Sequence, residues 1–416
     1  MKKNGFIMST YVYILLVFFL LLLGTMLVVL NNTRLLANKI KDNKNVNVDF
    51  NLILKGDKEI ILKKDSEYIE PGYIATTFDG KKLDVNVMGE VNVNKLGEYD
   101  IIYIAEYKGV EKKIRRKVIV AENLVTYITN LYKTNSILNN LKKDNTEDKN
   151  IRYYGSDPNN YVSFNNELWR IIGVFGNNVK LVRSEKLGYL SWDSSEESIN
   201  EGWGVNEWST SALKNYLNTM YYGGTSVTCY NAKNKQTTTC PTNKLNTESK
   251  TLIDYYTWKT GAIEMSKRTN TPAFYKSERG NVTGKICNGG SACNDTVERT
   301  TEWPGYIGLP YATDYAYASG ESICETNMVK QDSSNTYICK NNNWMFKPNT
   351  WYWTLSLDAY PSASRGVWLV YSDGHVGNIN AAYGAAIFPA IYLKTDILIK
   401  SGTGRSNDPY ILKAGS

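Results

Sequence analysis

Histidine is almost missing from this chain: His375 is the only one in 416 residues. Histidine is the side chain that most often acts as an acid or base near neutral pH, and it is a common zinc ligand. Any such chemistry would have to use His375, which follows Asp373 and Gly374 in a sequence typical of a hairpin turn. A surface turn residue is the simpler interpretation. We therefore expect no catalytic residue, no metal and no cofactor, and we do not expect an enzyme.

Cysteine is scarce as well, and no two cysteines have the C-x-x-C spacing of zinc or redox sites. All six lie in polar, glycine- or asparagine-rich stretches: Cys229, Cys240, Cys287, Cys293, Cys324 and Cys339. We expect disulfides between nearest neighbours, that is Cys229 with Cys240, Cys287 with Cys293 and Cys324 with Cys339. Other pairings and reduced cysteines are the alternatives. Because disulfides persist outside the cytoplasm, we expect this part of the chain to be extracellular.

Charged residues are absent from Val12 to Leu30, a run interrupted only by Gly24 and Thr25. About 20 apolar residues in a helix span the hydrocarbon core of a bilayer, whereas a cleaved signal peptide has a shorter apolar core. We predict that residues 1–45 form a transmembrane helical anchor with one pass. Lysine and arginine lie on both sides of the run, and counting them alone would favour the opposite orientation. We place the C-terminal part outside the cell because of the expected disulfides.

The net charge of +7 arises mostly within residues 1–45, where six lysines and arginines face one acidic residue, Asp42. A basic excess beside a membrane helix is typical of contact with lipid head groups. We therefore expect the membrane, and no nucleic acid, as the partner of this segment.

The first residues resemble the N-terminal region of type IV pilin-like proteins. A short basic leader, Lys2-Lys-Asn-Gly5, precedes Phe6 and the apolar run. In that family a peptidase cuts after the glycine, which would place processing between Gly5 and Phe6 and would make pilus subunits further partners. Thr10 stands where the family usually has glutamate, and a plain signal anchor is the alternative.

Residues 46–121 contain short β-type runs separated by turn signals such as Lys55-Gly-Asp57, which predicts an all-β sandwich. The segments Tyr68 to Ala75 and Lys95 to Tyr103 resemble the bacterial Ig-like domains of surface proteins, which implies a spacer role. Residues 122–150 combine a helix-like apolar pattern with a charged end at Lys142 to Lys149. We expect this stretch to be a helical linker.

Residues 151–416 are long enough to bury a core of their own. Glu167 to Phe175 and Val179 to Arg183 predict a hairpin, and three aromatic-rich blocks from Trp351 to Leu393 predict buried strands. Asn166 to Gly173, Ile307 to Tyr317 and the Ser-Asp-Gly block at 372–374 resemble a family of bacterial surface domains. That family is similar to the α+β C-type-lectin-like fold of formylglycine-generating enzymes and of the variable proteins of diversity-generating retroelements. The resemblance implies a lectin-like head with disulfide-stapled loops.

The loops between the C-terminal strands are small, polar and tyrosine-bearing, a composition typical of adaptable binding surfaces. In the retroelement proteins this stretch contacts ligand, so the resemblance makes seven residues the candidate binding surface: Tyr360, Ser362, Ser364, Arg365, Asn378, Asn380 and Tyr383. We expect an adhesin-like surface protein that binds an extracellular protein or glycan. A minor pilin at a filament tip is the alternative. A surface enzyme is less favoured, because no cysteine follows Cys339 into the last strands, where the oxidase relatives keep a reactive pair.

Overall fold

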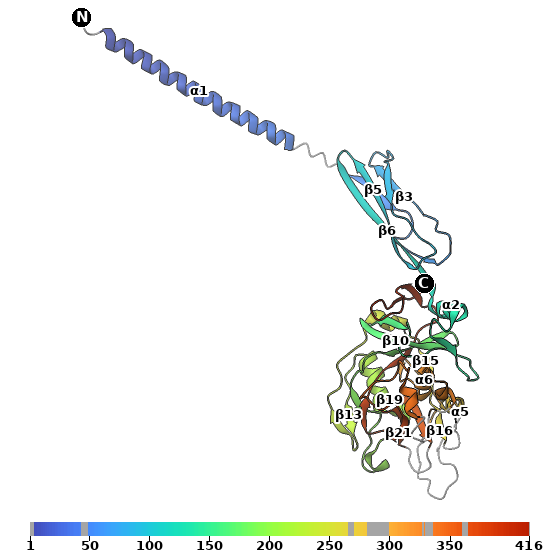
Figure 1. Ribbon diagram of the computed structural model, residues 1–416. Coiled ribbons are helices and arrows are strands. Elements are labelled where there is room, and N and C mark those ends of the chain that lie inside the picture. The colour runs from blue at the N-terminus through green and yellow to red at the C-terminus, as the bar shows by residue number, and fades with distance from the viewer. Residues whose placement is uncertain are drawn as a thin grey trace. The chain divides into compact units, whose positions relative to one another are not determined.

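The computed structural model describes residues 4–42, 49–264, 270–280, 299–326, 328, 336–359 and 365–415. Two compact units divide the chain. Unit 1 comprises residues 1–60, 69–91 and 100–117, and unit 2 comprises residues 61–68, 92–99 and 118–416. Figure 1 shows the elements of both, and each unit is described here by itself.

The helix α1 (Asn4–Asp42) confirms the predicted apolar helix. Its segment Tyr11–Arg34 is long and apolar enough to cross a membrane by length and composition, and all of the side chains in that segment are exposed. An apolar helix with no polar face buries its surface favourably only in lipid or in another apolar environment. The single pass and its orientation stay predictions.

Most residues of the predicted all-β module lie in unit 1. Strand β1 (Phe50–Leu54) pairs with β3 (Tyr73–Thr77), and β4 (Val85–Met88) pairs with β5 (Gly97–Tyr107). Strands β2 (Glu59–Lys63) and β6 (Val110–Asn123) complete the set. Alternate residues of β1 and β5 face a small core formed by Phe50, Leu52, Ala75 and Ala105. Buried and exposed residues thus alternate along these strands, as in a sheet with one face on a core.

The segment expected to be a helical linker, residues 122–150, is instead part of the folded unit 2. Helix α2 (Leu124–Asn135) begins after Asn123, whose side-chain oxygen accepts from the amide of Thr126 at 3.1 Å. Leu124 and Ile128 belong to the main core, and β7 (Leu141–Lys143) pairs with β8 (Ile151–Tyr153). The stretch thus contains a helix, and the apolar residues of this helix pack into the core of unit 2.

A large sheet forms one layer of unit 2. In spatial order its strands are β18 (Ile307–Gly308), β23 (Ala390–Tyr392), β11 (Asn178–Arg183), β10 (Glu167–Phe175), β9 (Tyr161–Phe164), β25 (Tyr410–Lys413), β24 (Leu398–Ser401) and the end of β6. Strands β10 and β11 form the predicted hairpin. Strand β25 runs parallel to β9, so the last strand of the chain joins the first part of the head.

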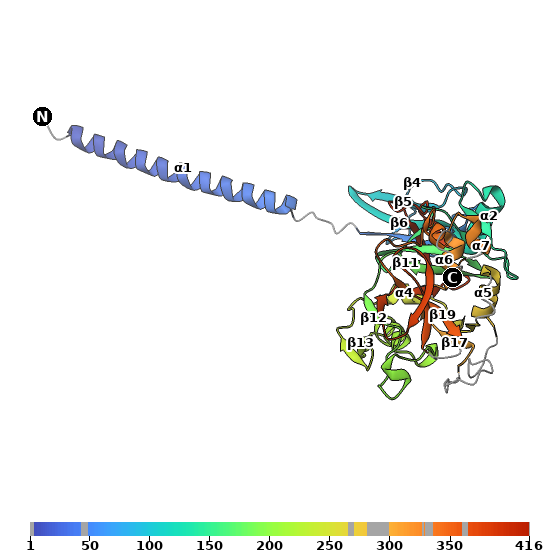
Figure 2. The same cartoon turned by 60° about the horizontal axis from the view of Figure 1, so that its bottom comes forward.

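A second sheet of unit 2 contains the first two aromatic-rich C-terminal blocks, whereas the third block contributes β23 to the large sheet. Its order is β12 (Tyr189–Ser191), β22 (Gly384–Ala386), β19 (Tyr352–Ala359), β20 (Gly366–Val370) and β21 (Val376–Asn380), with β16 (Ala262–Glu264) also beside β19. All eight residues of β19 are buried, and the Trp353 indole donates to the carbonyl of Leu190 at 2.9 Å. Figures 1 and 2 both show β19 between the β13 side and the α5 side of the unit. Trp353 is therefore a core residue, as predicted.

Shorter elements surround the two sheets. They are η1 (Asn200–Gly202), η2 (Trp208–Thr210), α3 (Ala212–Asn215), η3 (Tyr216–Tyr222), β13 (Cys229–Ala232), β14 (Gln236–Thr238), α4 (Thr247–Leu252), β15 (Tyr256–Lys259), α5 (Thr271–Glu278), β17 (Glu302–Gly305), α6 (Ala312–Ala318), α7 (Ser322–Thr326) and η5 (Thr336–Lys340). Two of the expected disulfides are present and join Cys229 to Cys240 and Cys324 to Cys339. Cys287 and Cys293 lie outside the described residues.

Candidate functional site

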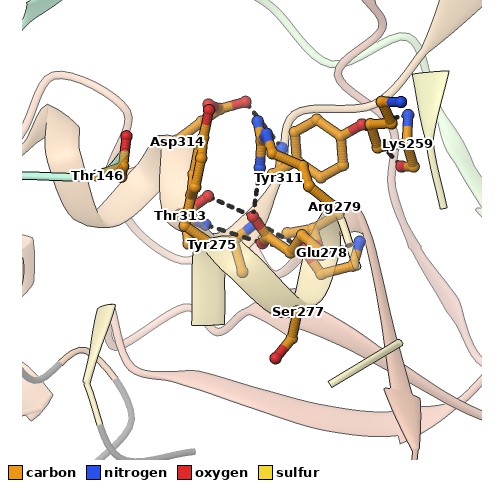
Figure 3. A network of polar contacts seen from close by, with 12 residues as sticks. Thr146, Lys259, Tyr275, Ser277, Glu278, Arg279, Tyr311, Thr313 and Asp314 are labelled. Carbon is orange, nitrogen blue, oxygen red and sulfur yellow. Dashed lines mark hydrogen bonds and ion pairs between the residues drawn. The ribbon is translucent and has the colours of Figure 1, made fainter. Parts of the chain in front are cut away.

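A buried carboxylate in helix α6, Asp314, receives two cations. Figure 3 shows this carboxylate near Tyr311 and Thr313. Lys180 of β11 and Arg152 of β8 each place a nitrogen 2.6 Å from one of its two oxygens. The backbone amide of Tyr311, at the start of the helix, donates to the same carboxylate at 2.9 Å. Burial alone would raise the pKa of Asp314, but the charges of Lys180 and Arg152 lower it to about 2. Asp314 is therefore ionised and holds three elements of the head together.

A second buried carboxylate, Glu278, ends helix α5 and lies beside the first (Figure 3). It accepts hydrogen bonds from the hydroxyls of Thr313 and Ser356 and from the guanidinium of Arg279 at 3.1 Å. Burial raises the pKa of Glu278 above its ordinary value, although Arg279 opposes the shift. Helices α5 and α6 and strand β19 are thus joined through one side chain.

The network around these carboxylates has the character of a structural core. Arg152 also donates from Nε to Asp144 at 2.7 Å, and both side chains are almost completely buried. Its guanidinium lies 4.6 Å from the ring centre of Phe175 and 4.7 Å from that of Tyr317. Because the ionic groups are closed off from solvent and committed to one another, this network positions the surrounding elements.

A pocket of about 510 Å³ opens beside the network. The segment Asn145 to Asp148 lines one part of it, and helix α5 with Arg279 and Gly280 lines the other. Tyr275 connects the pocket to the network, because its hydroxyl donates to Asp148 at 2.5 Å while its ring packs against the guanidinium of Arg279. No local pattern predicts this pocket, since its two sides are more than 120 residues apart along the chain.

Three of the seven predicted binding residues gather on one surface of unit 2. Arg365 contacts the 200–204 segment through Nη1, which lies 3.3 Å from the carbonyl oxygen of Asn200 and 3.2 Å from the carboxylate of Glu201. Asn380 accepts the amide of Tyr383 at 3.1 Å and so forms the turn that presents this tyrosine. Arg365, Asn380 and Tyr383, which were predicted from the sequence, therefore lie close together in the fold.

The ring of Tyr383 stacks on Trp203, with the ring centres 5.0 Å apart and the planes inclined by 27°. Two backbone contacts fix this arrangement, because Ala382 donates to the carbonyl of Trp203 at 3.0 Å and Ala381 donates to that of Arg365 at 2.8 Å. The ammonium of Lys233 lies 5.2 Å from the centre of the Trp203 ring. We call Trp203, Lys233, Arg365, Asn380 and Tyr383 the Trp203 surface.

Sequence reasoning missed Trp203 and Lys233, which come from segments far from the predicted loops. Trp203 follows three successive residues with positive φ, Asn200 at 49°, Glu201 at 55° and Gly202 at 74°. Two non-glycine residues in this conformation are uncommon, and such conformations are often found at functional sites. The run Asn200-Glu-Gly-Trp-Gly204 could have signalled an unusual turn that presents a tryptophan.

Asn378 is the fourth predicted binding residue that the structure describes, and it lies on β21 two residues before Asn380. Asn378 donates from its side chain to Asp358 at 2.7 Å. Tyr360, Ser362 and Ser364 lie outside the described residues. Gly5 and Phe6 fall in the first turn of α1, and their processing stays a prediction.

His375 occupies the predicted turn. Its Nδ1 lies 2.6 Å from the carboxylate of Asp373, and its ring stacks on Tyr371 with the ring centres 4.1 Å apart. Both contacts are local, since they join residues at most four positions apart in the sequence. They account for the histidine as part of the turn.

Comparison with known proteins identifies one module of the chain. Residues 52–120 match the family described as "Bacterial surface protein, Ig-like domain". A solved lipoprotein structure from Bacteroides thetaiotaomicron is 36% identical over 18% of this chain and 39% of that chain, with a TM-score of 0.17, so this chain spans well under two thirds of its length. No curated protein matches the chain. Residues 52–120 are therefore an Ig-like domain of bacterial surface proteins, which together with the apolar helix α1 fits a membrane-anchored or surface-located bacterial protein.

Proposed function

We propose that this protein is anchored in the bacterial membrane by α1 and binds an extracellular protein or glycan through the Trp203 surface. The stacked pair of Trp203 and Tyr383 carries this proposal. Tyr383 is 38% exposed and Trp203 is half-buried, so both rings remain partly accessible to a ligand. The Ig-like domain would act as the spacer between the anchor and the binding head.

The chemistry of the surface suits recognition. Tryptophan, tyrosine and arginine are the side chains most enriched at binding hot spots, because they offer a large contact area with few rotatable bonds. Ring faces pack against the CH groups of sugars as well as against apolar protein groups, and Lys233 and Arg365 add positive charge beside the rings. Glu201, which faces Arg365, is 79% exposed, so this ion pair is weak and open to exchange with a ligand.

Preorganisation is the second argument. The backbone hydrogen bonds from Ala381 and Ala382 hold the turn of Tyr383 against the segment of Trp203 before any ligand arrives. A surface that is already ordered avoids the entropic cost of ordering on binding. The resemblance of the head to C-type-lectin-like domains, and to variable proteins that bind ligand at the same strands, supports the same proposal.

The experiment is a binding screen of the full chain in detergent against arrays of glycans and bacterial or host surface proteins. Trp203→Ala should abolish the hits of the parent protein, because it removes the larger ring of the pair. Tyr255→Ala is the control. Like Tyr383, Tyr255 is an exposed tyrosine that packs against another ring, in this case that of Tyr306. Hits that survive Trp203→Ala unchanged would place the binding surface elsewhere.

A further inference from the structure

The pocket beside helix α5 has the dimensions and chemistry of a small-molecule site. Its volume of about 510 Å³ lies within the range of about 300 to 1,000 Å³ that is usual for ligand pockets. Polar and charged side chains dominate its lining, among them Asn145, Thr146, Asp148, Lys276 and Arg279. It is separate from the Trp203 surface, with which it shares no residue.

Arg279 is the group that indicates the ligand. Its guanidinium is held between two rings, 3.5 Å from the centre of Tyr275 and 4.6 Å from that of Tyr311. Among the described residues, Glu278 is its only hydrogen-bond partner, through Nη1 at 3.1 Å. A guanidinium has five N–H donors in a planar fork that matches a carboxylate. The guanidinium of Arg279 is held in place in the lining of the pocket, and most of its N–H donors have no partner among the described residues. It is therefore suited to bind a planar anion.

The acidic residues of the same pocket restrict which anion fits. Asp148 accepts from the hydroxyl of Tyr275, and Arg279 packs on the ring of the same tyrosine, so a negative and a positive group contact one side chain. Glu147 and Lys276 form an ion pair of 2.9 Å at the rim, with both side chains more than 70% exposed. A phosphate with nearly two negative charges would be repelled by Asp148 and Glu147. A monocarboxylate with hydrogen-bond donors of its own would satisfy both ends.

We propose that this pocket binds a small monocarboxylate that also carries hydroxyl or ammonium groups. Its carboxylate pairs with the fork of Arg279, and its hydroxyl or ammonium groups donate to Asp148 and to the side-chain oxygens beside it. Acidic sugars and amino acids share this chemistry, and binding measurements distinguish the two sources.

The test is calorimetric titration of the full chain in detergent with D-galacturonate, L-alanine, acetate and inorganic phosphate. Galacturonate or alanine should saturate the site, and the one that does so identifies the source. Acetate lacks the donors and phosphate has the wrong charge, so each should bind about tenfold more weakly or worse. The proposal is overturned if neither galacturonate nor alanine saturates, or if acetate or phosphate binds as tightly.

Two variants locate the binding, and a third serves as control. Arg279→Gln should lower the affinity for the carboxylate ligand by about tenfold or more. Arg279 packs against two rings, so its replacement could also disturb the fold. Asp148→Asn is therefore a second test, at an exposed position. It should weaken the binding of galacturonate or alanine and leave the binding of acetate unaffected. Arg365→Gln should leave carboxylate binding unchanged, and Arg279→Gln should leave the array hits unchanged, so the two proposals fail independently. Unaltered carboxylate affinity in both pocket variants would rule the site out.

Discussion

Lys180 and Asp314 form an ion pair in which both side chains are completely buried, with 2.6 Å between the ammonium nitrogen and the carboxylate oxygen. They come from β11 and α6, 134 residues apart, and join the large sheet to the helix that lies beside β19. Burial lowers the pKa of the Lys180 ammonium to about 8, although Asp314 opposes the shift. The pair therefore belongs to the buried framework that joins β11 to α6.

Lys180→Met should lower the free energy of unfolding of the head by about 3 kcal/mol or more, because it leaves a buried carboxylate with one cation fewer. Urea unfolding followed by tryptophan fluorescence measures the change. Lys235→Met is the control, since Lys235 and Glu196 form an exposed ion pair, and such pairs contribute little to stability. Equal effects of the two substitutions would contradict a structural role for the buried pair.

Acid should destabilise the head in a window set by Asp314. The pKa of this carboxyl falls from 3.8 to about 2 on folding, so its contribution is present above about pH 4 and is lost as the pH falls towards 2. The loss should amount to about 2 kcal/mol. In Lys180→Met the pKa of Asp314 should rise, and the fall in stability between pH 4 and 2 should be shallower. Unfolding curves at several pH values test this, and parallel curves for the two proteins would contradict it.

The two disulfides of the head should be recovered by peptide mapping without reduction. We expect Cys229 joined to Cys240, Cys324 joined to Cys339, and a third pair between Cys287 and Cys293. Replacing both Cys324 and Cys339 by alanine should cost about 3 kcal/mol, the value for a closed loop of about 15 residues. Six free thiols in protein taken from cells would refute both the pairing and the extracellular placement.

The anchor should determine how the protein fractionates. Full-length protein should sediment with membranes or with sheared filaments, whereas a chain that begins at Asn45 should remain soluble, because it lacks the apolar segment Tyr11–Arg34. Mass spectrometry of the mature N-terminus then separates the two forms of anchor. A chain that starts at Phe6 indicates pilin-type processing, and an intact leader indicates a plain anchor. Identical fractionation of the two proteins would contradict anchoring.

Much of the fold could be predicted from local patterns. The hairpin of β10 and β11 is encoded by apolar runs around Gly176-Asn-Asn178, and short β-type runs separated by turn signals predict the all-β module. The three C-terminal blocks form buried strands as expected, two in the second sheet and one, β23, in the large sheet. These features depend on residues that are neighbours in the sequence, so the sequence alone specifies them.

The parts that could not be predicted depend on distant contacts. Lys180 lies in a strand pattern where a charged residue normally faces solvent, and only its contact with Asp314 explains its burial. The stacking of Trp203 on Tyr383 likewise joins segments 180 positions apart. Four predicted loop residues are described, and three of them belong to this surface. Trp203, the other ring of this surface, could be identified only from the structure.

The central claim is tested most directly by the affinity of the full chain for its strongest array hit, compared between the parent, Trp203→Ala and Tyr255→Ala. Because Trp203 and Tyr383 carry the proposed binding surface, Trp203→Ala should weaken binding by about 2 kcal/mol or more, which is about thirtyfold. Its melting temperature should stay near that of the control, since Trp203 lies outside the buried core. An affinity for Trp203→Ala equal to that of the parent and of Tyr255→Ala would contradict the account.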